Sequence, residues 1–407
     1  MVDVLKIGLI IAGIIVLIRF KVALSHTLFA SALVLGLLFQ LSAGDMIDGV
    51  LAAALSVDNL KLVLALQFVL LFSALLKENG SMARAIAALS CVLRDARFTV
   101  AIIPAVVGLL PVVGGAMLSA PLVGEASDEL RLSPERRTFL NFWFRHVWEF
   151  TLPTFPAVFL TASISGVPVA ELVAVGVPLT LAAILSGAVF GFKGVKSSRH
   201  GAAAGSPWRG VAEFVRNLLP FFIVILLTVA FDVHLVYPMA AVTVGVILCN
   251  RMPVATVKRL ARAHLSLELA LLIWGIMVFK EVLMRTRAMD HMAADLSAMG
   301  IPVIVLIVLV PALIAFITGY TTAFVGLSFP VLAPFIGTGG MEAFYVMLGL
   351  ASGICAHMLS PMHACLVMTL DYYEAPMGKT YRLLYAPVAA LFLAAVGVFA
   401  AGSLWFG

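Results

Sequence analysis

The chain has 407 residues, of which 63% are hydrophobic and 12% are charged, and its mean hydropathy is +1.12. A soluble globular chain is about 45–50% apolar and about 25% charged. The composition therefore excludes a disordered chain, a disulfide scaffold and a nucleic-acid binder, despite a net charge of +5. It predicts an all-α polytopic membrane protein with about 10 transmembrane helices, since each spanning helix needs about 20 apolar residues.

Apolar runs predict the elements of a first half in chain order. Helices are expected over 4–19, 22–41 and 60–77. After them come a stretch broken by Gly and Pro, a helix interrupted by prolines and a further helix, over 97–125, 138–163 and 168–192. The second half gives the same order of elements, over 214–231, 234–250, 264–284, 301–336, 341–370 and 380–405.

The two halves also match in sequence as an internal repeat. The segment AMLSAPLV at 116–123 corresponds to VGLSFPVL at 325–332, and adding 208 to the number of Pro153 gives Pro361. Such internal similarity between halves is a feature of many transporter folds. We expect a first repeat, a cytoplasmic linker and a second repeat, over 1–192, 193–212 and 213–407.

The broken stretches predict two re-entrant hairpins. Residues 97–110 would span about 21 Å as a helix, which is too short for a hydrocarbon core of about 30 Å. The segment ends in PVVGG at 111–115, and a second short arm follows. A single kinked spanning helix is the alternative. Hairpins are preferred because they leave most of the 26 Lys and Arg residues on the cytoplasmic side, as the positive-inside rule requires.

An odd number of crossings in each half would insert the two halves with opposite orientation. Paired broken segments in such an inverted repeat are typical of secondary transporters with a site near the bilayer midplane. In this topology both termini lie outside, and we expect the protein in the inner (cytoplasmic) membrane.

Three motifs, at 111–123, 141–150 and 360–369, read PVVGGAMLSAPLV, NFWFRHVWEF and SPMHACLVMT. They resemble an integral-membrane family known as domain-of-unknown-function family 401. The order of elements is similar to that of the ion transporter superfamily, which includes carboxylate, gluconate and sodium/proton transporters. That resemblance implies a homodimer and an elevator mechanism, with scaffold helices over 4–77 and 214–284 and transport cores over 97–192 and 301–407. The hairpin tips lack the Ser-Asn-Thr signatures of the sodium-coupled dicarboxylate members.

The hairpin tips and the interrupted helices form the expected substrate site. Free N–H groups at helix N-termini favour an anion, and carbonyls freed by proline can bind a cation or a substrate. Tight packing of small residues and simple proline kinks are the structural alternatives. The expected substrate-binding residues are Gly114, Gly115, Ser119, Thr151, Thr154, Thr318, Gly319, Thr321, Thr322, Ser360 and His363.

Ionisable residues beside the breaks are expected to couple transport to a cation. Adding 208 to the number of Glu149 gives His357, so the two should occupy equivalent positions. Ionisable groups inside a membrane are costly and point to function. Glu149, His357 and His146 are predicted to exchange a proton, and Arg145 to pair with Glu149 or to meet an anionic substrate. The structural alternative is a polar network that only holds helices together.

The sequence therefore predicts a secondary active transporter of a small, anionic, carboxylate-like solute, coupled to H+ or Na+, with no enzymatic activity and no cofactor. Two alternatives use His146, Glu149, His357 and His363 as metal ligands. One is a carrier of a metal or other cation, and the other is an intramembrane metal-dependent enzyme. A channel is a further alternative. Cys355 and Cys365 are expected to be small buried apolar residues.

Overall fold

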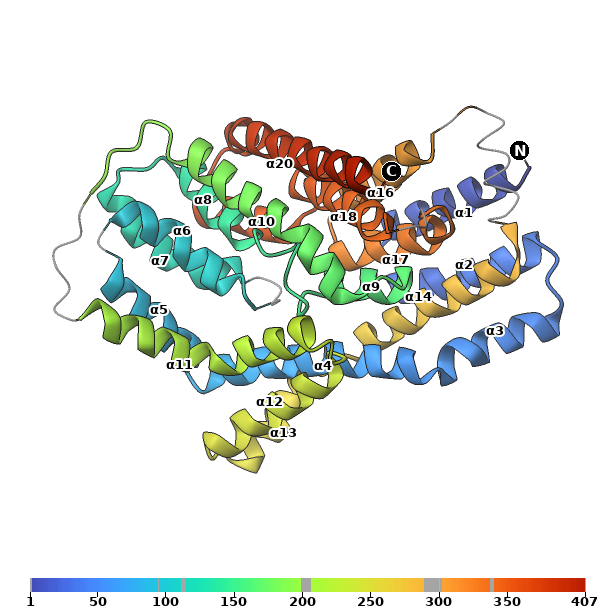
Figure 1. Cartoon of the computed structure of the whole chain (residues 1–407), viewed down its shortest axis with the longest axis horizontal. Coiled ribbons are helices and arrows are strands. Elements are labelled where there is room, and N and C mark those ends of the chain that lie inside the picture. The colour runs from blue at the N-terminus through green and yellow to red at the C-terminus, as the bar shows by residue number, and fades with distance from the viewer. Residues whose placement is uncertain are drawn as a thin grey trace.

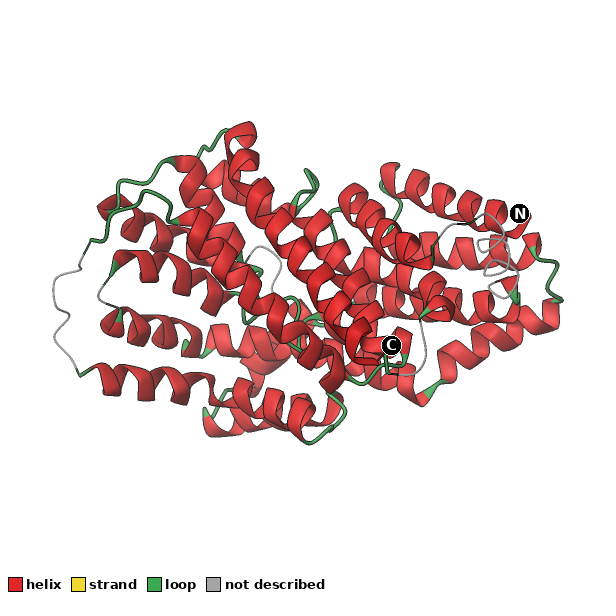
Figure 2. Ribbon diagram, turned by 45° about the horizontal axis from the view of Figure 1, so that its top comes forward, coloured by secondary structure: helices red, strands yellow, loops and turns green. Residues whose placement is uncertain are grey.

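Helices make up the regular structure in a computed structural model of the chain (Figure 2). The structure describes residues 2–93, 95–110, 115–198, 206–288, 300, 302–336 and 340–406. Within these ranges there is no strand. The all-α prediction is confirmed for this part of the chain.

The first half begins with five helices, α1 to α5, at Val2–Arg19, Leu24–Leu38, Ala43–Leu55, Val57–Glu78 and Ser81–Val92. The broken stretch forms the short helices α6 and α7, at Ala96–Val107 and Ala116–Glu129. The interrupted helix forms α8 and α9, at Pro134–Arg145 and Pro156–Ser165. Helix α10, Val169–Gly191, ends this half.

The second half follows the same order. It begins with α11, Pro207–Ile225, which continues as the π-helical turn η1, Leu226–Ala230. Helices α12, α13 and α14 follow at Val236–Cys249, Val254–His264 and Leu267–Arg285. The second broken stretch forms α16, α17 and the 3₁₀ turn η2, at Val303–Thr318, Thr321–Leu332 and Ala333–Phe335. The interrupted helix forms α18 and α19, Glu342–Met358 and Ala364–Tyr372, and α20 covers Met377–Phe406.

Three helices were absent from the expectation, namely α3, α5 and α13. Each is short, with 13, 12 and 11 residues. Charged residues such as Asp48, Arg84 and Lys258 interrupt their apolar runs, so a search for continuous apolar segments passes over them. Helix α11 likewise starts at Pro207 rather than near 214, because Arg209 and Glu213 conceal its first turns.

Four helices are long and apolar enough to cross a membrane, within Val57–Glu78, Val169–Gly191, Pro207–Ala230 and Met377–Trp405. Other apolar helices have 10–17 residues, among them α6, α9, α16 and α17. At about 1.5 Å per residue, α6 is too short to cross a core of about 30 Å. The described helices thus have the lengths and apolarity of a helical membrane protein.

The helices of the two halves pack in reciprocal pairs. Helix α4 packs on α12 and α14 on α2, while α9 packs on α17 and α19 on α7. Helix α10 packs on α20, and both pass near the middle of the molecule, between the end with α6 to α8 and the end with α1 to α3 (Figure 1). This arrangement brings the starts of several short helices together near α9 and α17.

The expected linker is tied to the start of α6. The Asp95 carboxylate caps this helix and pairs with Arg97, with 2.7 Å between Asp95 Oδ2 and Arg97 Nη2. Ser197 Oγ donates to the same carboxylate, and Ala96 N donates to Ser198 O. The hydrogen bonds and charge of Arg97 lower the pKa of Asp95 to about 2. Residues 199–205 lie outside the described residues.

Candidate functional site

Both interrupted helices are broken where the sequence predicts. Between α8 and α9, residues 146–155 form turns, and between α18 and α19 the break covers residues 359–363. Proline explains the first break, since Pro153 and Pro156 cannot donate an N–H and disfavour helix in the residue before them. Pro361 has the same effect in the second break. Helix α9 restarts at Pro156, where the missing N–H costs no hydrogen bond.

A cavity of about 280 Å³ lies where the two breaks meet. Its walls combine residues more than 200 positions apart, because α8, α9, α18 and α19 converge there with the starts of α14 and α17. The lining residues are Leu70, Arg145, His146, Glu149, Phe155, Pro156, Ser266, Leu269, Gly319, Tyr320, Thr321, Thr322, His357, His363, Ala364 and Cys365.

Three helices start at this cavity without a side-chain cap. The N-cap residues of α9, α17 and α19 are Phe155, Tyr320 and His363, and none of their three side chains accepts a hydrogen bond from its helix. The first N–H groups of a helix have no partner within it, and they carry the positive end of the helix dipole. Three such ends around one cavity favour a negatively charged group.

The ionisable side chains of the cavity are almost completely buried. Exposed fractions are 5% for Arg145, 2% for His146, 5% for Glu149, 4% for His357 and 3% for His363. Glu149 Oε2 and His357 Nδ1 have no hydrogen-bond partner among the described residues. Buried polar atoms are nearly always hydrogen-bonded, so these two atoms of the cavity are candidates for hydrogen bonds to a bound molecule.

Glycine and threonine shape the second-half wall. Gly319 ends α16 with φ of +63°, and a Cβ there would lie 2.5 Å from the Met362 carbonyl carbon. Only glycine allows both the left-handed conformation and this close approach to the break at Pro361. Thr321 and Thr322 follow in the first turn of α17 and line the cavity.

Other predicted binding residues hold the surrounding structure. Ser119 Oγ lies 2.6 Å from Asn141 Oδ1, Thr151 Oγ1 lies 3.0 Å from Thr180 Oγ1, and Ser360 Oγ donates to Phe316 O. Thr318 Oγ1 donates to Ile314 O one turn back in its own helix. None of these hydroxyls lines the cavity.

The first hairpin tip is only partly described. Gly114 lies outside the described residues. Gly115 lies against the guanidinium of Arg145, since a Cβ there would be 2.5 Å from Nη2. Thr154 is buried in the first break, and its Oγ1 has no hydrogen-bond partner among the described residues. Neither Gly115 nor Thr154 lines the cavity.

A family model described as a protein of unknown function, DUF401, matches residues 3–401. The chain belongs to the DUF401 family. A comparison with curated proteins finds no match.

Sequence reasoning missed the contribution of α4 and α14 to this DUF401 cavity. Leu70 lies in α4, and Ser266 and Leu269 lie at the start of α14. Gln67 joins the two helices, because its Nε2 donates to Ser266 O at 2.6 Å and its Oε1 accepts from Ser266 N at 2.9 Å. A lone glutamine in the apolar run of α4 is the signal that could have found this contact.

Cys365 was predicted only as a small buried apolar residue, and it also lines the cavity. Among the described residues, the group close enough to hold one metal ion is His146, His363 and Cys365, all buried. Of the predicted metal ligands His146, Glu149, His357 and His363, this group contains His146 and His363. Its third member is the thiol of Cys365 rather than a carboxylate.

Proposed function

We propose that the protein is a secondary active transporter of a small, anionic, carboxylate-like solute, coupled to H+ or Na+. The observation that carries the proposal is the cavity in which Arg145 and three uncapped helix N-termini converge. The proposal includes the inner membrane with both termini outside, a homodimer, no chemical step and no cofactor.

The charges of the cavity support an anionic solute. Among the described residues that line the cavity, one is a lysine or arginine, namely Arg145, and one is an aspartate or glutamate, namely Glu149. Arginine binds carboxylates through two parallel hydrogen bonds. The N–H groups of α9, α17 and α19 add donors, so a carboxylate here would replace its lost water with fixed donors.

The size of the cavity supports a small solute. Pockets for drug-sized ligands have volumes of about 300–1,000 Å³, and this cavity has about 280 Å³. A compact organic acid fits such a volume. Phe155, Leu70 and Leu269 line part of the wall and would contact its carbon skeleton.

The position of the cavity supports alternating access. Its lining comes both from the proposed scaffold, through Leu70 and Leu269, and from the proposed transport cores, through α9, α17 and α19. A site at the boundary of two such parts changes its access when one part moves against the other. The reciprocal packing of α4 with α12 and α14 with α2, and of α9 with α17 and α19 with α7, supports an inverted repeat within the ion transporter superfamily.

Glu149 supports coupling to a cation. Its carboxylate lies in the same cavity as the anion site, and its Oε2 has no partner among the described residues. Two negative groups in one low-dielectric cavity repel strongly. A proton or Na+ at Glu149 would remove this repulsion, so solute and cation would bind together.

Thermal stabilisation of the purified protein tests the proposal, because a ligand that binds the folded state raises its apparent stability. The panel holds small carboxylates, sugar acids, amino acids and divalent metals, each with and without Na+ and at two pH values. We expect a carboxylate to stabilise the protein and then to accumulate in proteoliposomes under an H+ or Na+ gradient.

A contrary result would be stabilisation by divalent metals with no carboxylate response, which favours a metal carrier. Turnover of a compound in detergent, without a gradient, would favour an enzyme. Flux that does not saturate with solute concentration would favour a channel.

A further inference from the structure

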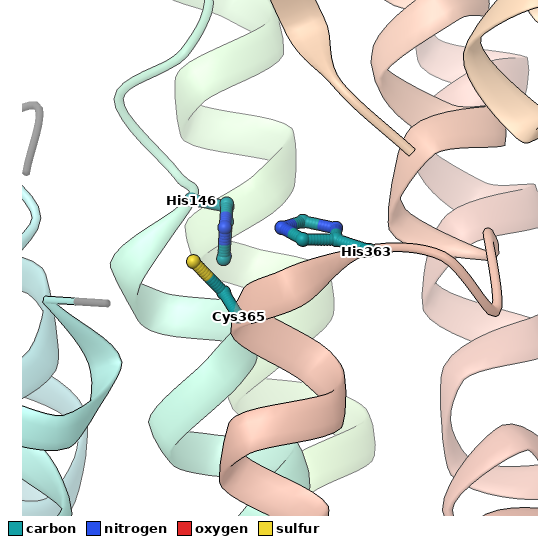
Figure 3. Close-up of side chains that lie close together, drawn as sticks. All are labelled: His146, His363 and Cys365. Carbon is teal, nitrogen blue, oxygen red and sulfur yellow. The ribbon is translucent and has the colours of Figure 1, made fainter. Parts of the chain in front are cut away.

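His146, His363 and Cys365 converge from two segments that are more than 200 residues apart in sequence (Figure 3). His146 follows the last residue of α8, whereas His363 precedes α19 and Cys365 lies in its first turn. One ligand atom from each lies within 4.8 Å of the others, and all three residues are buried. The first-half break supplies one of these side chains and the second-half break supplies two.

Hydrogen bonds orient both imidazoles for metal binding. His146 Nδ1 lies 2.6 Å from Phe142 O, and His363 Nδ1 lies 3.1 Å from His357 O. A carbonyl oxygen only accepts, so each Nδ1 carries the hydrogen and each Nε2 keeps its lone pair. Metal-binding histidines are held in this way, with the second ring nitrogen donating to a carbonyl or carboxylate.

The remaining neighbours support the same three ligands. Arg145 Nη1 donates to Cys365 Sγ at 3.5 Å and so holds the third ligand in place. His357 stacks face to face on His363, with 3.7 Å between ring centroids, and so packs against a ligand ring. The Phe142 ring packs against both ligand rings, with its centroid 4.6 Å from that of His146 and 5.0 Å from that of His363.

We propose that His146 Nε2, His363 Nε2 and Cys365 Sγ bind a thiophilic transition-metal ion, with Zn²⁺ as the first to test. A thiolate with two imidazoles suits such ions, whereas Na+, Mg²⁺ and Ca²⁺ prefer oxygen ligands. Zinc binds nitrogen at about 2.0–2.1 Å and sulfur at about 2.3 Å, so its ligand atoms lie roughly 3.3–3.8 Å apart. The three atoms would therefore move together by about 1 Å, and the thiol proton would leave to water as the metal–sulfur bond forms.

Three protein ligands leave a fourth metal position open toward the cavity, as in zinc sites that bind a substrate. Zn²⁺ with one thiolate ligand carries a net charge of +1. The open position would thus accept one carboxylate of the solute. This link to the solute rests on the proposed function, whereas the metal site itself does not. A metal ion held here would replace the expectation that the transporter has no cofactor.

Cobalt spectroscopy tests the site in the full-length protein. The protein is purified in detergent, stripped with a chelator and titrated with Co²⁺, and Zn²⁺ is then added. We expect one equivalent of Co²⁺ to produce a sulfur-to-cobalt charge-transfer band and visible bands of a four-coordinate ion, which Zn²⁺ abolishes. Cys365→Ser should remove the charge-transfer band, and His146→Gln and His363→Gln should each weaken Co²⁺ binding at least 10-fold.

Matched variants control for folding and for binding elsewhere. Cys355→Ser replaces another buried cysteine, in α18, and His234→Gln replaces a histidine outside the cavity. Both should keep the spectrum of the unmodified protein, and all variants should elute as single species with similar melting temperatures. A missing sulfur band in the unmodified protein, or one that persists in Cys365→Ser, would overturn the site.

Carboxylate binding in the same preparation separates the two proposals. Carboxylate stabilisation of stripped protein that gives no cobalt band would remove the metal site and leave the transporter. A sulfur–cobalt band in a protein that neither binds nor accumulates carboxylates would keep the metal site and remove the proposed solute.

Discussion

The two helix breaks have similar backbones and different chemistry. The first, between α8 and α9, carries a guanidinium, a carboxyl group and an imidazole, on Arg145, Glu149 and His146. The second, between α18 and α19, carries imidazoles and a thiol, on His357, His363 and Cys365. In the repeat expected from the sequence, Glu149 corresponds to His357, so a carboxyl group in one half is paired with an imidazole in the other.

This difference indicates a division of labour within one cavity. A helix restarts after the proline break in each half, and the uncapped starts of α9 and α19 provide free N–H groups on both sides. In the proposed transporter, the first break adds Arg145 and Glu149, which would select an anion and its coupling cation. The second adds neutral ligands with lone pairs, which are suited to a metal or to hydrogen bonds. His146 of the first break joins His363 and Cys365 of the second at the proposed metal site. Substitutions of Arg145 and Glu149 should instead change solute binding and coupling, which matched substitutions outside the cavity should leave intact.

The largest effect is expected from Arg145→Gln. Removing the charge from a buried partner typically costs about 3–5 kcal/mol, and every 1.4 kcal/mol is about tenfold in affinity. We expect carboxylate binding to fall at least 100-fold, as measured by calorimetry or thermal shift. Arg136→Gln, in the exposed first turn of the same helix, should bind as the unmodified protein does. Equal losses in both variants would remove Arg145 from the anion site.

Substitution of Gly319 tests how the second hairpin tip meets the second break. Gly319→Ala introduces a Cβ 2.5 Å from the Met362 carbonyl carbon, in a left-handed residue, so we expect a loss of about 2–5 kcal/mol in stability. Gly166→Ala is the control, because Gly166 has φ of +78° but nothing within 4 Å of its Cβ position, and should lose only about 1–2 kcal/mol. Melting curves in detergent compare the two, and similar shifts would contradict the close contact.

Glu149→Gln separates binding from coupling. The glutamine side chain is permanently neutral, so it does not repel a negatively charged solute. The carboxylate solute should therefore bind without a coupling cation, within about threefold of the original affinity. Exchange of solute across proteoliposomes should persist, while accumulation driven by an H+ or Na+ gradient should fall at least 10-fold. Glu171→Gln, in the exposed first turn of α10, should keep gradient-driven accumulation. Gradient-driven uptake that survives in Glu149→Gln would assign coupling to another group.

The smallest effects should divide the predicted hydroxyls into two classes. Thr321→Ala removes a hydroxyl that lines the cavity and should weaken solute binding about 5–10-fold, at about 1–1.5 kcal/mol for one hydrogen bond. Ser360→Ala leaves Phe316 O without its donor and should lower stability by about 1–3 kcal/mol with unchanged affinity. The opposite pattern would exchange their roles.

Much of the fold could be predicted, because long apolar runs and prolines act locally. The runs over 168–192 and 380–405 became α10 and α20, and the prolines at 153, 156 and 361 mark both breaks. Helices α3 and α13 escaped prediction because each gains stability from packing, on α14 and α4 respectively, rather than from an apolar run of its own.

The site was predicted in part for the same reason. Charged residues beside a proline break are visible in sequence, and Arg145, Glu149 and His357 all line the cavity. The hydroxyls could not be sorted, since Ser119 and Thr321 look alike in sequence. The hydrogen-bond partner decides whether a hydroxyl is structural, and the Ser119 hydroxyl donates to Asn141 Oδ1 rather than facing the cavity.

The sequence by itself determined an all-helical, membrane-like chain, because composition, apolar runs and proline positions depend only on near neighbours along the chain. The tertiary structure decided which side chains share one cavity. His146, His363 and Cys365 meet there although more than 200 residues separate them, and Leu70 and Leu269 complete the wall from α4 and α14. Contacts of this kind depend on how helices pack in space, and helix packing buries side chains by shape and partner rather than by their order in the chain.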